Sequence, residues 1–97
     1  MKAIFIAFNQ AYYEDIISIM DRNGINGFTY WDSVACRGSH TVEPHLGSHA
    51  WPTMNGAFLT MVEDGQVERF LKLLHKLDTQ SDGQGLLALV LIVDQTI

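Results

Sequence analysis

The chain has 97 residues, 47% of them hydrophobic, which is enough for one domain with its own core but not for two. Its formal net charge is −5 and its six Lys and Arg residues are scattered, which argues against nucleic acid and against an anionic membrane surface as partners. One cysteine allows no internal disulfide and no apolar run approaches the length of a membrane span, so we expect a cytoplasmic protein without membrane insertion.

The first third of the chain predicts two strands separated by a helix. Residues 2–8 are β-branched and aromatic and are apolar at odd and even positions, which is typical of a strand buried on both faces rather than of a signal peptide. Asn9 then offers an N-cap to a helix that ends near Gly24, a residue suited to a left-handed cap. The apolar positions of this helix fall on one stripe: Tyr12, Ile16, Ile19 and Met20. Residues 28–36 are rich in Phe, Tyr, Trp and Val and predict the second strand.

The last part of the chain predicts two more strands and a second helix. Residues 56–63 predict a third strand, and Asp64 is an N-cap candidate for a second amphipathic helix. The core stripe of that helix is Val67, Phe70, Leu71, Leu74 and Leu77. Residues 79–85 have turn composition, and residues 86–94 predict the fourth strand. The order β-α-β-β-α-β indicates one α+β domain over residues 1–97, a ferredoxin-like two-layer sandwich with a four-stranded antiparallel sheet.

The hydrophobic pattern predicts more burial than two helices can provide. Two helices cover only one face of a four-stranded sheet, so the other face should alternate to polar residues if it met water. Residues 2–8 and 86–94 do not alternate. The fourth strand is apolar on both parities: Leu86, Leu87, Leu89, Val90, Leu91, Ile92 and Val93. We therefore expect the uncovered face to be buried, most simply against copies of itself in a closed cyclic oligomer.

The segment between Cys36 and Asn55 fits neither helix nor strand and carries three of the four histidines. Long irregular loops in small domains are usually functional, so we expect the ligand here. Its candidate metal ligands are His40, Glu43, His45 and His49, a set suited to nickel, cobalt or zinc. The alternative is that these are solvated loop histidines. Cys36 is interpreted as a small core residue, with metal ligation or nucleophilic chemistry as the alternative.

Five further residues are candidates for contact with a bound small ligand: Arg37, Gly38, Trp51, Gly83 and Gly85. Arg37 and Gly38 can present a guanidinium and backbone amides to an anion, or can form a plain exit from the strand. Trp51 either anchors the returning end of the loop or offers a stacking platform. Gly83 and Gly85 serve turn geometry or a phosphate. No nucleophile–base pair accompanies them, so we do not expect an enzyme.

Several short motifs resemble those of the nitrogen-regulatory PII-like signalling proteins. Residues 27–29 (GFT) leading into 34–40 (VACRGSH) look like the second strand of that family running into its T-loop, the loop between strands 2 and 3. Residues 81–85 (SDGQG) are similar to its glycine-bearing B-loop, which precedes the last strand. Residues 47–52 (GSHAWP), followed by a strand, are similar to a short divergent subgroup. The order of the elements and the uncovered apolar face agree with this resemblance.

The resemblance implies a homotrimer whose subunits pack by their sheets. It also implies a T-loop at about residues 37–55 that binds and regulates a protein partner, and a small ligand or divalent metal in the cleft between subunits. The trimeric cation-tolerance protein CutA shares the architecture, and it would make the histidines a metal-binding site. A third alternative is an engineered assembly component, in which apolar positions such as Leu87 or Ile92 of the last strand form a second interface.

The chain also departs from classical PII proteins, which hold ATP with B-loop backbone and basic residues, including residues after the last strand. Here residues 81–85 contain no Lys, and no Lys or Arg follows Lys76. Arg37 is the only cation near the predicted cleft. Because a triphosphate normally requires several cations or Mg²⁺ together with loop amides, we do not expect classical ATP binding. An adenylate-like or uncharged ligand, or a metal, fits this composition better.

Overall fold

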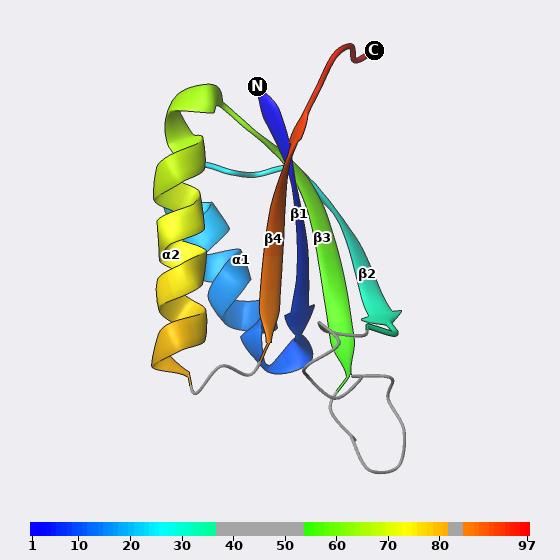
Figure 1. Ribbon diagram of the computed structural model, residues 1–97, viewed down its shortest axis with the longest axis vertical. Coiled ribbons are helices and arrows are strands. Elements are labelled where there is room, and N and C mark those ends of the chain that lie inside the picture. The colour runs from blue at the N-terminus through cyan, green and yellow to red at the C-terminus, as the bar shows by residue number, and fades with distance from the viewer. Residues whose placement is uncertain (37–53, 82–84) are drawn as a thin grey trace.

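The computed structural model describes residues 1–36, 54–81 and 85–97 of the chain. The elements follow one another as β1 (Lys2–Asn9), η1 (Gln10–Tyr12), α1 (Tyr13–Arg22), β2 (Phe28–Val34), β3 (Asn55–Val62), η2 (Asp64–Gln66), α2 (Val67–Gln80) and β4 (Leu86–Ile92). The predicted α+β ferredoxin-like order is therefore confirmed (Figure 1). Helix α2 includes the first two residues of the predicted turn, and β4 ends two residues earlier than predicted.

The four strands form one antiparallel sheet in the order β2-β3-β1-β4. At the centre of the sheet, Ile6 of β1 lies opposite Phe58 of β3 on one side and Ala88 of β4 on the other. Both helices lie on the same face of this sheet, side by side (Figure 1). The fold therefore has the two layers that the sequence predicts.

The core lies between the helices and the sheet, and its centre is aromatic. Phe58 is fully buried, and its ring centroid lies 5.0 Å from those of Phe8 and Phe28, 5.1 Å from that of Tyr30 and 5.7 Å from that of Tyr13. Most of the predicted helical stripes join this core. Their buried members are Tyr12, Ile16, Ile19, Met20, Phe70 and Leu74. Aromatic pairs at these separations add to the stabilisation that burial alone provides.

The other face of the sheet, which we call the open face, carries no helix of the described residues. Alternation and register place Ala3, Phe5 and Ala7 of β1 on it, opposite Leu91, Leu89 and Leu87 of β4. These three leucines keep 46%, 44% and 53% of their surface exposed. On the other flank Trp31 and Met61 are 43% and 40% exposed. The predicted uncovered apolar face is confirmed.

Of the three predicted helix caps, two are confirmed and one is wrong. Asn9 accepts a hydrogen bond from the backbone N–H of Ala11 at 2.8 Å and so caps η1, which leads into α1, and Gly24 has the expected positive φ of 72°. The prediction for Asp64 is wrong, because Glu63 occupies the cap position of η2 and makes no side-chain cap bond. The Asp64 carboxylate instead accepts from the amino group of Met1 at 2.6 Å and from Lys2 Nζ at 3.1 Å. The end of β3 lies beside the start of β1, so the nearby cations compete with the helix amides.

Candidate functional site

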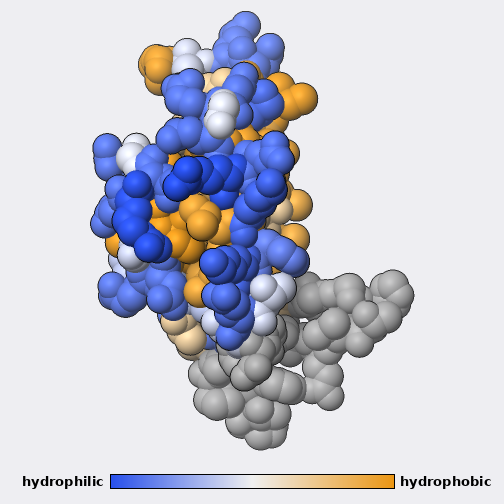
Figure 2. Space-filling view, turned by 90° about the vertical axis from the view of Figure 1, so that its left-hand side faces the viewer, coloured by the Kyte–Doolittle hydropathy of each residue, from blue (hydrophilic) through white to orange (hydrophobic). Residues whose placement is uncertain are grey.

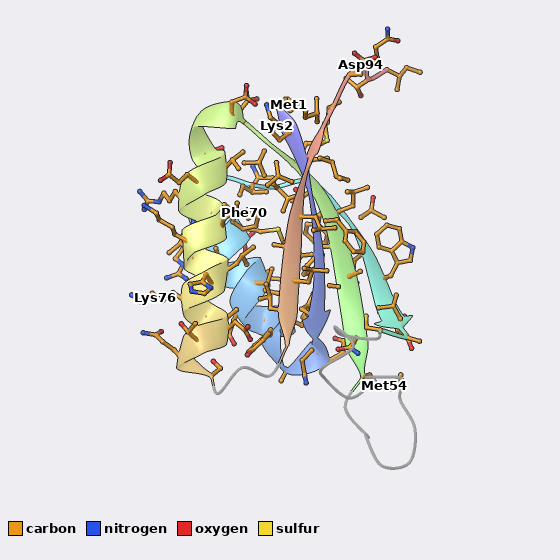
Figure 3. The ribbon with its side chains drawn as sticks, in the orientation of Figure 1. Met1, Lys2, Met54, Phe70, Lys76 and Asp94 are labelled. Carbon is orange, nitrogen blue, oxygen red and sulfur yellow. The ribbon has the colours of Figure 1, made fainter. Side chains whose placement is uncertain are left out.

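The described residues that flank segments 37–53 and 82–84 lie at the same end of the sheet. Strands β1 and β2 finish there, and β3 and β4 begin there. In Figure 3 Met54 marks this end, and Met1 and Lys2 mark the opposite one. We call it the loop end, and its described residues are Asn9, Gln10, Asp32, Cys36, Met54, Asn55 and Gly85.

Most of the predicted site residues lie outside the described part of the chain. These are the ligand candidates Arg37, Gly38, Trp51 and Gly83 and the metal candidates His40, Glu43, His45 and His49. Their roles stay predictions. Within residues 1–36, 54–81 and 85–97, no group of three His, Cys, Asp or Glu side chains could hold a metal ion.

Gly85 is the predicted site residue that the structure describes. Its φ of 117° lies in the region that favours glycine. Its N–H donates to Asp78 Oδ1 at 3.3 Å, and its carbonyl accepts from the Asn9 N–H at 3.0 Å. Both peptide groups of Gly85 are thus engaged inside the fold, which favours turn geometry over contact with a phosphate.

Asp78 anchors this turn from the end of α2. The oxygen that accepts from Gly85 also accepts from the Tyr12 hydroxyl at 2.8 Å, and Tyr12 is 2% exposed. The carboxylate therefore joins the C-terminal turn of α2 to η1 and to the start of β4. Sequence reasoning missed this residue, because its partner Tyr12 lies 66 positions away and no local pattern indicates the pairing.

Gln10 forms a second anchor at the loop end. Its backbone N–H donates to the Met54 carbonyl at 2.8 Å, and its Nε2 donates to the Asp32 carbonyl at 2.6 Å. The Tyr30 hydroxyl donates to Gln10 Oε1 at 3.1 Å. One residue thus contacts both the end of β2, at Asp32, and the residue before β3, Met54. Its only sequence signal was its position directly after the first strand.

Gly56 provides the space that the Gln10 amide occupies. A Cβ added at Gly56 would lie 2.8 Å from Gln10 Nε2, 3.0 Å from Phe8 Cζ and 3.2 Å from the Trp31 carbonyl oxygen. The close approach therefore requires glycine at this position on β3. The three strands β1, β2 and β3 meet tightly where residues 37–53 depart and return.

Cys36 is half-buried, and this burial raises the pKa of its thiol above the ordinary value. The thiol is accordingly protonated near neutral pH, whereas nucleophiles and metal ligands act as thiolates. This arrangement favours the interpretation of Cys36 as a small packing residue over the chemical alternatives.

The described cations lie elsewhere on the molecule. Lys2 lies at the opposite end, Arg22 ends α1, and Arg69, Lys72 and Lys76 belong to α2. Lys76 projects from the outer side of α2, away from the sheet (Figure 3). None of these five side chains is therefore among the described residues of the loop end.

A groove at the opposite end of the molecule is a competing site. It encloses about 370 Å³ between α2, β1 and β4 and is lined by Lys2, Asp64, Val67, Glu68, Leu71 and Val90. Figure 2 views the side formed by α2 and shows hydrophobic side chains exposed between polar ones. Two of its three charged lining residues, Lys2 and Asp64, are already paired with each other at 3.1 Å, and the groove lies at the end of the sheet opposite the loop end. The loop end is therefore the better candidate.

Comparisons with known proteins connect this architecture to solved structures. The sequence matches no protein-family model and no curated protein. Its fold is similar to CPII of Thiomonas intermedia K12 bound to ADP and bicarbonate, with a TM-score of 0.73 and 19% identity over 92% of this chain and 81% of that one. Another structure of CPII, described as a nitrogen regulatory PII-like protein and bound to ADP, AMP and bicarbonate, has a TM-score of 0.71 and 18% identity over 99% and 94% of the two chains.

A protein of Thermus thermophilus, described as a PII-like signalling protein, gives a TM-score of 0.63 and 20% identity over 92% of this chain and 82% of that one. At these identities the likeness shows the fold. The resemblance to PII-like proteins that the sequence motifs indicate is confirmed at that level. No helix among the described residues is long and apolar enough to cross a membrane.

Proposed function

We propose that this protein is a PII-like signalling protein, a cytoplasmic homotrimer that binds a small ligand at the loop end and regulates a protein partner through residues 37–55. The observation that carries this proposal is the match in fold to CPII over nearly the whole chain. The attachment of both undescribed segments at one end of the sheet supports it, because one ligand could then contact both. The protein acts by binding and not as an enzyme.

The proposed ligand is an adenine mono- or diphosphate, with a small carboxylate-like anion such as bicarbonate beside it. The CPII structures contain ADP, AMP and bicarbonate. The charge of this chain supports the smaller phosphates, since the loop end has no Lys or Arg among its described residues and the chain carries −5 overall. A triphosphate would place more negative charge at a site with one nearby cation, Arg37.

The homotrimer is supported by the open face. An exposed surface that includes Leu87, Leu89, Leu91, Trp31 and Met61 is unusual on a monomer and is typical of an interface. Copies packed through these faces in a closed ring would bury it. Ligand clefts would then lie between neighbouring copies, each lined by loop-end residues of two copies.

A calorimetric titration of the metal-free protein with ADP, AMP, ATP and bicarbonate tests the ligand. We expect saturable binding of ADP or AMP, one per copy, with ATP at least about tenfold weaker. Arg37→Ala should weaken ADP binding by about tenfold or more, because it removes the predicted cation. Lys76→Ala is the matched control, since it removes the same charge from the outer side of α2. Absence of nucleotide binding, or equal losses in the two variants, would contradict the proposal.

Metal binding of the CutA type is the second candidate. The observation that favours it is the gathering of His40, Glu43, His45 and His49 within ten residues. Titration of the same protein with nickel, cobalt and zinc distinguishes the two candidates. Saturable binding that His40→Ala and His49→Ala both abolish would establish the metal site. Weak binding that both variants retain would show that these histidines do not form the metal site.

A further inference from the structure

Two successive backbone amides, at the end of β1 and just after it, donate hydrogen bonds to the residues that follow segments 82–84 and 37–53. The Asn9 N–H donates to the carbonyl of Gly85, the first residue after 82–84, at 3.0 Å. The Gln10 N–H donates to the carbonyl of Met54, the first residue after 37–53, at 2.8 Å. The backbone amides of Asn9 and Gln10 are therefore hydrogen-bonded to the first described residue after each of the two segments.

The Gln10 side chain also contacts β2, the strand that leads into residues 37–53. The ladder between β2 and β3 shifts between Trp31 and Val34, so that Asp32 and Ser33 together stand opposite Gly56 alone. A bulge of this kind interrupts the ladder and redirects the strand. At this bulge the Asp32 carbonyl accepts from Gln10 Nε2 at 2.6 Å. Gln10 thus contacts both the chain that leads to residue 37 and the chain that returns at Met54.

The hydrogen bond to the amide oxygen fixes the orientation of the Gln10 side chain. The Tyr30 hydroxyl donates to Gln10 Oε1 at 3.1 Å, and Tyr30 itself packs on Tyr13 and Phe58 in the core. Because Oε1 accepts, Nε2 is the atom that must face the Asp32 carbonyl. Gly56 closes the other side of the amide, since any Cβ there would lie within 2.8 Å of Nε2. The amide is held from three sides although the residue is only half-buried.

We propose that Gln10 is a positioning residue for ligand binding at the loop end. By bonding Asp32 and Met54 together it sets the separation between the two ends of the 37–55 segment. Through its neighbour Asn9 it ties that separation to the position of Gly85. A ligand at the loop end then meets a frame that Gln10 already holds in place, and its binding energy is not spent on ordering that frame. Because it presupposes a ligand at the loop end, this role rests on the proposed function.

The first test measures ADP affinity by calorimetry in three variants. Gln10→Ala removes both side-chain bonds, and we expect about a tenfold loss of affinity. Gln10→Glu keeps the acceptor for Tyr30 but removes the donor to Asp32, so it should lose as much. Tyr30→Phe is the matched control, because it keeps the ring and the Asp32 bond, and we expect at most about a threefold loss. Equal affinities of wild type, Gln10→Ala and Gln10→Glu would overturn the proposal.

A second readout separates positioning from general stability. Hydrogen exchange of the Asn9 and Gln10 amides, followed by NMR, reports the two returning chains separately, because each amide has a different partner. In the wild type, ADP should slow exchange at both amides. In Gln10→Glu we expect ADP to slow exchange at Asn9 and to lose most of its effect at residue 10, while buried amides of β1 exchange as in the wild type. Unaltered ADP protection at both amides would overturn the role of Gln10.

Gly56→Ala provides an independent route that leaves Gln10 intact. The added methyl displaces the Gln10 amide, so it should lower ADP affinity in the wild type and do so much less in the Gln10→Ala background. Equal effects in both backgrounds would speak against Gln10 as the mediator. A wild type that binds neither ADP, AMP nor bicarbonate would refute the proposed function itself. Binding by the wild type with no change in the variants would refute only the role of Gln10.

Discussion

The two faces of the sheet have similar compositions but different surroundings. On the helix face Ile4, Ile6 and Phe8 are at most 1% exposed, because α1 and α2 cover them. On the open face Leu87, Leu89 and Leu91 keep about half of their surface. A hydrophobic pattern therefore predicts that a face avoids water without indicating what would cover it. Elements of the same chain cover the helix face, whereas no helix of the described residues covers the open face, where we propose that other copies of the chain pack.

The largest effect is expected from a charge on the open face. Leu91 and Ile92 are neighbours on β4 and point to opposite faces of the sheet. Leu91→Asp should abolish the proposed trimer, because a closed ring repeats the buried carboxylate in every copy. Ile92→Asp should leave the trimer intact, although Ile92 is 84% exposed and Leu91 only 46%. Sedimentation measurements over a range of concentrations give the mass of each variant.

This pair of variants separates the open face from apolar exposure in general. If exposed apolar surface alone drove association, Ile92→Asp would have the larger effect. A wild type that stays monomeric would contradict the interface, and so would a Leu91→Asp variant that keeps the mass of the trimer.

The second-largest effect is expected from a substitution in the core on the helix face. Phe58→Ala removes the ring that four other rings contact, and we expect it to lower the free energy of unfolding by about 3–5 kcal/mol. Phe28→Ala is the matched control, because Phe28 meets Phe58 edge-on at 5.0 Å but is 42% exposed. Its cost should be about 1 kcal/mol. Urea unfolding at a fixed protein concentration measures both, and equal costs would show that the aromatic core is not centred on Phe58.

The fold was predictable because its signals are local and repeated. The stripe that includes Phe70 and Leu74 and the apolar run of the first strand each follow from the spacing of neighbouring residues. The open face was predictable for the same reason, since the parity of a strand is a local property. Short motifs in residues 27–40 and 81–85 then indicated the PII-like fold, which the solved structures confirm.

The anchors of the loop end were not predictable, because they join residues that only the fold brings together. Asp78 bonds Tyr12 across 66 positions, and Gln10 bonds Asp32 across 22. Asp64 illustrates the same limit, since a local rule made it a helix cap whereas Lys2, 62 positions away, is a partner of its carboxylate. Gln10 has no chemical motif of its own. Its proposed role depends on the bulge opposite Gly56, which the sequence does not indicate.

A smaller effect concerns the buried hydroxyl of the helix face. Thr60 is 2% exposed, and its Oγ1 donates to the Gly27 carbonyl. Thr60→Val keeps the shape but leaves that carbonyl without its donor, which should cost about 1–2 kcal/mol in the free energy of unfolding. Thr60→Ser keeps the hydroxyl and loses only a methyl group, so it separates the bond from the packing. If the serine variant were the less stable of the two, packing and not the hydrogen bond would dominate at this position.

The smallest effect lies outside both faces, at the ion cluster where Asp64 meets the amino terminus. Hydrogen bonds from the Met1 amino group and then from Lys2 hold the pKa of the Asp64 carboxyl below its ordinary value. A carboxyl whose pKa is lower in the folded state stabilises that state above its unfolded pKa, about 3.9, and loses this contribution as the pH falls through the folded pKa. Asp64→Asn should therefore lower the melting temperature slightly at neutral pH and not at all in strong acid.

Lys2→Met tests this last comparison further, because it removes the second of the two donors together with its charge and leaves the Met1 amino group in place. It should lose less than half of the effect of Asp64→Asn at neutral pH. Both differences should also shrink as salt is added, since the carboxylate is exposed to solvent. A difference between Asp64→Asn and the wild type that persisted in strong acid would contradict the ion cluster. It would indicate that the aspartate acts on the geometry at the start of η2, as the local capping rule would have it.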